Sequence, residues 1–480
     1  MSADYDLIIR NASVIDGTSA PRFAADVAVR GDRIARVGSL AGARANTEID
    51  ARGHVVAPGF IDAHTHDDRL LLSDPAMTPK VSQGVTTVIT GNCGISLAYS
   101  PKHSATLPPL DLLDSEGGWF RYPRFSDYCD ALRANPAATN AACLVGHTTL
   151  RAATMQRLDR PASADEIAHM RSLAHDALAA GAIGLSTGTA YPPAAAAPMQ
   201  EIVEVCRPLA DFGGLYVTHM RNEDDQITDA MEETFSIGRT LGVPAVISHH
   251  KCVGKANHGR SGETLALIER TRGAQDIGLD CYPYIASSTV MQAARVGQST
   301  KVLVTWSKPH PEFTGKTLSE VAQAMGVNQT EAAERLRPAG AIYFMMDERD
   351  VQRILGYEHT MIGSDGLPHD ARPHPRLWGT FARVLGHYAR DLALFPLEVA
   401  VYKMTGLTAA RFGLEDRGVL RAGAYADLTL FDPMSVIDTA SFDDPKQPAR
   451  GIHTVIVNGE PVWSAGAATG ARPGRVLKRA

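Results

Sequence analysis

Short apolar segments alternate with helical segments through the middle of this 480-residue chain. There are eight, at residues 59–64, 85–90, 143–147, 182–187, 215–219, 245–249, 278–282 and 360–365. Parallel strands that are buried on both faces are almost continuously apolar and are followed by helices. The steps from His219 to His249 and on to Tyr282 are close to the ~30 residues that each repeat takes in a barrel of about 250 residues. The pattern predicts an α/β fold, a TIM-like (β/α)8 barrel.

The two ends of the chain share a different pattern, with short strands and tight turns. Residues 7–16 are a strand candidate, and residues 27–37 are typical of a hairpin that turns at Gly31-Asp32. Residues 426–431 and 454–460 repeat this pattern. Because each set alone is too small for a core, we expect residues 1–57 and 410–480 to form one small β-sandwich domain beside a barrel of residues 58–409. Two separate β appendages are the alternative.

Two of the steps between apolar segments are longer than a repeat needs. The stretch from Cys93 to His147 predicts an extra loop. The stretch from Asp280 to Met361 includes a proline-rich segment at 306–311 and a helical segment at 318–322. We expect this insertion, at about 285–348 after barrel strand 7, to fold over the barrel mouth as a lid or a subunit contact.

Charge and composition exclude several classes of protein. Lysine and arginine total 47 against 53 acidic residues, a net charge of −6, which gives no electrostatic basis for binding nucleic acid. No run of about 18 apolar residues occurs, so we expect no membrane span. The first residues lack the pattern of a secretory signal, and the six cysteines are scattered singly. We therefore expect a cytoplasmic enzyme with a small-molecule substrate.

Residues of metal-ligating type stand at or just after the ends of five of the eight segments. They are His64 and His66, Cys93, His219, His249 and Asp365. Side chains two apart on a strand share a face, so His64 and His66 point the same way. Active sites of (β/α)8 barrels form where the strands end. Nitrogen, sulfur and oxygen donors together suit zinc better than magnesium or calcium, so the sequence predicts a zinc site there.

With these motifs the chain resembles the amidohydrolase superfamily, and within it the N-acyl-D-amino-acid deacylases (D-aminoacylases). The resemblance extends over essentially the whole chain and rests on residues 58–66, 91–94, 218–223, 247–251, 281–284, 363–365 and 374–376. It implies zinc-dependent hydrolysis of an N-acyl-D-amino acid to a carboxylate and a free D-amino acid. The preference for the D form rests on the resemblance alone.

The resemblance also implies how the metal ligands divide. Cys93, His219 and His249 would hold one tightly bound zinc, and His64 and His66 a second, weaker site. Many binuclear relatives bridge two metals with a carboxylated lysine at the end of strand four, but residues 184–188 contain no lysine. A Cys93 thiolate can take that place. His250 would face away from the site, toward a helix.

The resemblance assigns further roles in catalysis and substrate binding. Asp365 is the candidate general base and then acid, besides being a metal ligand. Lys251, Tyr282 and Arg376 would bind the α-carboxylate of the substrate. Arg295 is a candidate on its position alone, at the start of the long insertion near the barrel mouth. A cation there would pair with a second carboxylate and favour N-acyl-D-glutamate or N-acyl-D-aspartate; a plain exposed arginine is the alternative.

Two other functions stay open at this point. One is a cyclic-amide hydrolase of the hydantoinase or dihydroorotase type, which the missing strand-four lysine and Cys93 disfavour. The other is a non-catalytic amidohydrolase-like assembly protein, which would be expected to have lost metal ligands. The sequence does not choose between a monomer and a homo-oligomer.

Overall fold

The computed structural model describes residues 3–102 and 107–480, so residues 1–2 and 103–106 of the two predicted domains lie outside the described residues. The middle of the chain forms parallel strands separated by helices, which confirms the α/β fold. These strands are β6 (Phe60–Asp62), β7 (Val85–Thr90), β8 (Asn140–Cys143), β9 (Val145–Gly146), β10 (Gly184–Gly188), β11 (Leu215–His219), β12 (Ala245–Ile247), β13 (Ile277–Cys281) and β17 (Thr360–Ile362).

The parallel strands follow one another in space nearly in chain order. One sheet has the order β17-β13-β12-β11-β10-β9, and a second contains β8-β7-β6. Two backbone hydrogen bonds join the sheets at their edges: Ala63 donates to the Ile362 carbonyl at 3.1 Å, and Ile183 donates to the Cys143 carbonyl at 3.0 Å. The carboxyl ends of all these strands therefore lie on one side.

Helices follow most of these strands. The longer ones are α3 (Phe125–Ala134), α4 (His147–Thr154), α5 (Ala164–Ala180), α7 (Met199–Cys206), α9 (Ile227–Leu241), α10 (Ser261–Arg272), α13 (Glu348–Gly356), α14 (Arg376–Arg383), α15 (Leu397–Met404) and α16 (Gly406–Phe412). Ser163 is the N-cap of α5, since its side chain accepts a hydrogen bond from the Glu166 backbone. Gly181, with φ of +109°, ends this helix.

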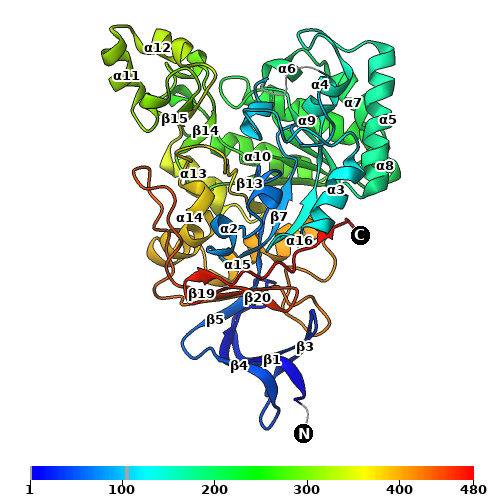
Figure 1. Ribbon diagram of the computed structural model, residues 1–480, viewed down its shortest axis with the longest axis vertical. Coiled ribbons are helices and arrows are strands. Elements are labelled where there is room, and N and C mark those ends of the chain that lie inside the picture. The colour runs from blue at the N-terminus through cyan, green and yellow to red at the C-terminus, as the bar shows by residue number, and fades with distance from the viewer. Residues whose placement is uncertain (1–2, 103–106) are drawn as a thin grey trace.

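Strands from both ends of the chain form a single sheet of nine strands. Its order is β21-β20-β19-β18-β5-β1-β2-β3, with β4 paired to β1. The strands are β1 (Tyr5–Val14), β2 (Phe23–Arg30), β3 (Arg33–Gly38), β4 (Ala45–Asp50), β5 (Val55–Pro58), β18 (Leu428–Phe431), β19 (Ile452–Val457), β20 (Glu460–Ser464) and β21 (Ala467–Ala468). One buried apolar cluster, which includes Leu7, Val27 and Leu428, unites residues from both ends. In Figure 1 these strands lie together at the end where the chain begins.

The last strand differs from the prediction for residues 410–480. β22 (Val476–Leu477) lies outside the terminal sheet and pairs in parallel with β8 (Asn140–Cys143). The strand is interrupted at Leu144, between β8 and β9. β22 pairs with the edge of β8 that does not face β7.

The stretch between β13 and β17 forms a compact unit of its own. Its three strands, β14 (Ala286–Val290), β15 (Lys301–Ser307) and β16 (Ala339–Phe344), pair antiparallel in the order β14-β16-β15. Helices α11 (Leu318–Met325) and α12 (Gln329–Leu336) follow β15 and lie at the opposite end of the molecule from the terminal sheet (Figure 1). No helix of residues 3–102 and 107–480 combines the length and apolar character needed to cross a membrane.

Candidate metal centre

Five of the six predicted ligands lie in the loops that follow the parallel strands, and the sixth, His219, is the last residue of β11. β12 ends at Ile247 and β17 at Ile362, so His249 and Asp365 come after the strands, not on them. Cys93, His249 and Asp365 have φ angles of +53°, +35° and +47°. A left-handed backbone costs a residue other than glycine about 1–3 kcal/mol, and such residues cluster at functional sites.

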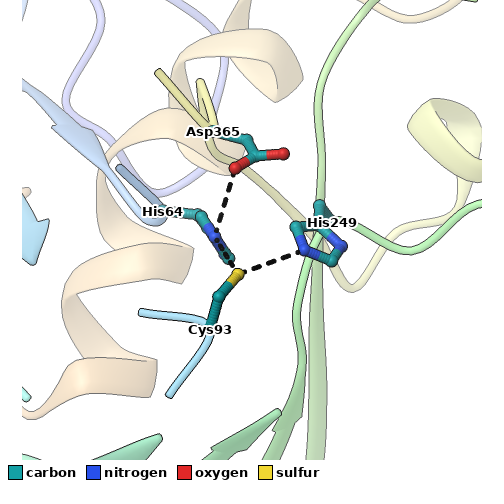
Figure 2. A group of neighbouring side chains, drawn as sticks. All are labelled: His64, Cys93, His249 and Asp365. Carbon is teal, nitrogen blue, oxygen red and sulfur yellow. Dashed lines mark hydrogen bonds and ion pairs between the residues drawn. The ribbon is translucent and has the colours of Figure 1, made fainter. Parts of the chain in front are cut away.

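The thiol of Cys93 lies among three imidazoles. Its Sγ is 3.3 Å from His64 Nε2, 3.4 Å from His249 Nε2 and 3.7 Å from His219 Nδ1. All four side chains are buried. Figure 2 shows the thiol pointing at His64 and His249, with Asp365 facing the same His64 nitrogen, Nε2, as the thiol does.

Asp365 completes this cluster and connects it to a cation. Its Oδ1 lies 3.3 Å from His66 Nε2 and 3.6 Å from His64 Nε2. Its Oδ2 lies 2.9 Å from Arg376 Nη2. Although burial opposes ionisation, Arg376 keeps the pKa of Asp365 well below its usual range. The structure thus brings together all six residues predicted as ligands.

The chemistry of this cluster fits a zinc ion. Burial lowers the pKa of His64 to about 3, so the imidazole is neutral, which is the form that binds metals. Burial also raises the pKa of the Cys93 thiol, and a bound cation is what would stabilise a thiolate there. Among the described residues, His64 Nδ1, His66 Nδ1 and His219 Nε2 have no hydrogen-bond partner. The donor set contains sulfur, nitrogen and oxygen, as zinc sites do.

Two of the four predicted substrate-binding residues line a cavity beside the cluster, and Tyr282 and Arg376 are not among its lining residues. The cavity is lined by His66, Leu112, Tyr191, His219, Glu223, His249, Lys251, Ser287, Ser288, Thr289, Arg295, Asp365 and Leu367. Lys251 and Arg295 thus line it directly. Arg376 is fully buried behind Asp365, and its guanidinium carbon lies 4.5 Å from the centre of the Tyr282 ring.

The polar atoms of these residues are paired to different degrees. Lys251 Nζ donates to Glu223 Oε1 at 2.5 Å. Arg295 is half-buried and donates to Gln292 Oε1 at 3.0 Å. Within the described residues, the Tyr282 hydroxyl and the Nε and Nη1 atoms of Arg376 have no partner.

Two carboxylates that received no role from the sequence also face the histidines. Glu223 Oε1 lies 3.2 Å from His249 Nδ1, and Asp280 Oδ2 lies 3.5 Å from His64 Nδ1. Burial raises the pKa of Asp280 to about 7. The available signal was an aspartate inside an otherwise apolar segment, residues 278–282, and a glutamate within the segment 218–223.

A buried network fixes the loops that carry His64 and Asp365. Lys80 Nζ donates to Asp62 Oδ2 at 2.7 Å and to Ser364 Oγ at 2.8 Å, and it is fully buried. Gly363 allows the two loops to approach, because a Cβ there would lie 2.6 Å from the Cβ of His64.

Two further histidines were considered as strand-end residues. His250 faces Thr264 of α10 with Nε2 to Oγ1 at 2.8 Å, as expected for a histidine turned away from the site. His147, the last residue of the apolar segment 143–147, is not part of a strand: β9 ends at Gly146 and His147 is the first residue of α4. It lies 3.4 Å from Glu201 and has no contact with the cluster above.

Comparison with known proteins identifies the family. The model of the Amidohydrolase family matches residues 47–463, most of the chain. The chain belongs to the amidohydrolase family. This amidohydrolase is 61% identical to D-aminoacylase of Alcaligenes xylosoxydans xylosoxydans, with 100% of this chain and 98% of that protein aligned. It is 53% identical to the N-acyl-D-aspartate deacylase of that organism (99% and 95%) and 47% identical to its N-acyl-D-glutamate deacylase (100% and 98%).

Solved structures give the same relationship. A D-aminoacylase structure described for its binuclear metal center matches with a TM-score of 0.97 at 61% identity, over 99% of this chain and 100% of that chain. The N-acyl-D-glutamate deacylase of Bordetella bronchiseptica, complexed with zinc and a phosphonate inhibitor, matches with a TM-score of 0.95 at 46% identity, over 99% of each chain. The L-hydantoinase of Arthrobacter aurescens, at 16% identity and a TM-score of 0.64 over 99% of this chain and 100% of that chain, shares the fold alone.

Proposed function

We propose that this amidohydrolase hydrolyses N-acyl-D-amino acids to a carboxylate and a free D-amino acid. The observation that carries the proposal is the buried Cys93 thiol within 3.7 Å of three imidazoles, in a chain 61% identical to a D-aminoacylase. The preference for the D form comes from the relatives alone.

Zinc is the metal that we propose for this site. Cys93, His219 and His249 would hold it tightly, and His64, His66 and Asp365 would form a second, weaker site. Bound there, the metal supplies a Lewis acid that polarises the scissile carbonyl and lowers the pKa of a water molecule from about 15.7 toward about 7.

Asp365 is the proposed proton carrier of the reaction. Its carboxylate accepts the proton of the attacking water and then donates it to the leaving amine. Arg376 keeps the pKa of Asp365 below its usual range, so the group is ionised before the reaction begins, which is the form that accepts a proton. Arg376 holds Oδ2, which leaves Oδ1 on the side of His64 and His66.

Arg376, Tyr282 and Lys251 are the proposed partners of the substrate α-carboxylate. The free Nε and Nη1 atoms of Arg376 and the free Tyr282 hydroxyl support this assignment, since buried donors without a partner are costly unless a ligand uses them. Hydrogen bonds from cations to a carboxylate are about twice as strong as neutral ones.

Arg295 is the proposed recognition residue for an acidic side chain. It lines the cavity together with His219 and Asp365, which supports a contact with the substrate beyond the amide bond. We propose that the enzyme favours N-acyl-D-glutamate for this reason. Relatives for aspartate and for glutamate substrates are 53% and 47% identical to this chain, so overall identity does not decide the side chain.

The finer architecture is also a proposal. The parallel strands β6 to β13 and β17 would close into a (β/α)8 barrel in which β8 and β9 together make the third strand. Residues 1–57 and 410–480, apart from β22, which pairs with β8, would form the β-sandwich domain, 58–409 the barrel, and about 285–348 its insertion. The two edge-joining hydrogen bonds support the closure. We propose a cytoplasmic location because all six cysteines are free.

A substrate panel tests the function. Zinc-loaded enzyme is assayed with N-acetyl and N-formyl derivatives of D- and L-amino acids, and with hydantoin and dihydrouracil. We expect turnover of the D derivatives. Turnover of the cyclic amides alone would favour the hydantoinase type. Protein that holds less than a trace of zinc after gentle purification, and turns over nothing, would indicate a non-catalytic assembly protein.

A further inference from the structure

One carboxylate, Glu223, lies against both histidines of the proposed zinc site and against the substrate-binding lysine. Its Oε1 is 3.2 Å from His249 Nδ1 and 2.5 Å from Lys251 Nζ. Its Oε2 is 3.7 Å from His219 Nε2. All four side chains are buried, so solvent does not screen these interactions.

The two imidazoles turn opposite ring nitrogens toward the thiol and toward the carboxylate. His249 presents Nε2 to Cys93 Sγ at 3.4 Å, and His219 presents Nδ1 at 3.7 Å. A neutral imidazole carries one ring proton, so a nitrogen that binds metal leaves the proton on the other nitrogen. That proton faces Glu223 in both histidines.

The neighbouring lysine cannot replace the carboxylate in this role. Lys251 Nζ lies 2.8 Å from His249 Nδ1, but an ammonium group has no acceptor for an imidazole N–H. His219 Nε2 has no hydrogen-bond partner in the described part of the chain, and Glu223 is the carboxylate that it faces. Glu223 is therefore within hydrogen-bond distance of His249 Nδ1, at 3.2 Å, and it faces His219 Nε2 at 3.7 Å, from where a small shift of the ring would complete the second bond.

We propose that Glu223 is a positioning residue that sets zinc affinity by fixing the proton position and ring orientation of both His219 and His249, and that it also holds Lys251 in the cavity. The inference rests on the zinc site proposed above. Partners of this kind typically contribute 10–100-fold to metal affinity.

A second cation site is the competing explanation of the same three residues. The ligand atoms of His219, Glu223 and His249 lie within 4.8 Å of one another. Lys251 Nζ, however, lies 2.5 Å from Glu223 and 2.8 Å from His249 and so places a positive charge in that position. This disfavours a further metal ion there and favours the positioning role.

Zinc affinity, measured by competition with a chromophoric chelator, tests the proposal without reference to turnover. The variants are E223Q, K251M and the control E233Q, whose wild-type carboxylate pairs with Arg221 at 2.8 Å and does not line the cavity. We expect E223Q to weaken zinc binding by about 10–100-fold, because an amide turns a donor toward one imidazole N–H. K251M and E233Q should keep wild-type affinity, whereas K251M should raise KM.

Several outcomes would overturn the inference. One is a folded E223Q whose zinc affinity is within about twofold of wild type; another is an equal loss in K251M, which would mean that the effect travels through the ammonium. If E223Q shows no cooperative thermal transition, E223D replaces it. The shorter side chain of E223D should still weaken zinc binding clearly, and a wild-type zinc affinity in E223D would also overturn the inference. Wild-type protein that binds no zinc through Cys93 would overturn the proposed function as well.

Discussion

The guanidinium of Arg376 lies 2.9 Å from Asp365 Oδ2, and both side chains are buried. The pair connects the proposed proton carrier to the proposed carboxylate-binding residue. One cation keeps Asp365 ionised, and in the proposed function its free donors also bind the substrate carboxylate. Substitutions of Asp365 and of Arg376 separate these two functions.

Replacement of Asp365 by asparagine should separate metal binding from turnover. Asparagine keeps the size of the side chain but does not accept the proton of the attacking water. We expect D365N to keep most of its zinc, measured by elemental analysis, and to lose about 10²–10⁴-fold in kcat. D416N, which alters an aspartate paired with Arg33 in the terminal region, should behave as wild type. Near-normal turnover in zinc-loaded D365N would rule out the proton-carrier role.

Replacement of Arg376 by alanine should affect substrates according to their carboxylate. Hydrogen bonds to charged groups contribute about 1.5–3 kcal/mol, or ~10–150-fold. R376A should therefore lose that much more kcat/KM for an N-acyl-D-amino acid than for the matching acyl amine without a carboxylate. The control is R383A, which alters the same helix at a residue that bonds the Pro283 carbonyl. An equal loss for both substrates in R376A would mean that the arginine acts through Asp365 alone.

Replacement of Arg295 by alanine tests the preference for acidic side chains. Wild-type enzyme should prefer N-acetyl-D-glutamate to N-acetyl-D-leucine in kcat/KM, and R295A should lose about tenfold or more of that preference. The control is Q298A, a neighbour whose wild-type amide donates to Asp224. A preference that is the same before and after R295A would remove Arg295 from substrate recognition.

Removal of the buried ammonium of Lys80 should destabilise the fold. Breaking a buried ion pair from one side typically costs about 3–5 kcal/mol, because the partner charge stays buried without compensation. K80M leaves the Asp62 carboxylate buried without its cation, whereas the control K308M removes a lysine that is exposed on the surface. We expect the thermal midpoint of K80M to fall well below that of K308M. Equal midpoints would show that Asp62 finds another partner.

The sequence predicts the residues of this site better than their geometry. Strand-end position and donor chemistry are local features, so Cys93, His219 and Asp365 could be selected without coordinates. The left-handed φ angles of Cys93 and Asp365 could not be predicted from the sequence. They depend on loops that are held by contacts between residues distant in sequence, such as the hydrogen bond from Lys80 to Ser364.

Residues that act through other residues were the hardest to predict. Glu223 contacts His249 because β11 and β12 lie side by side, and Asp280 contacts His64 because β17 lies between β13 and the end of β6; no spacing along the chain encodes these neighbours. The pairing of β22 with β8 was not predicted for a similar reason, since a strand of two residues carries too little sequence pattern to assign its partner strand.

Zinc-edge X-ray absorption of the zinc-loaded protein tests the central claim most directly, with C93S as the comparison. We predict one sulfur ligand at about 2.3 Å and nitrogen ligands at about 2.0–2.1 Å in the wild type, with the sulfur ligand absent from C93S. A spectrum with nitrogen and oxygen ligands alone in the wild type, or one that C93S leaves unchanged, would contradict the account.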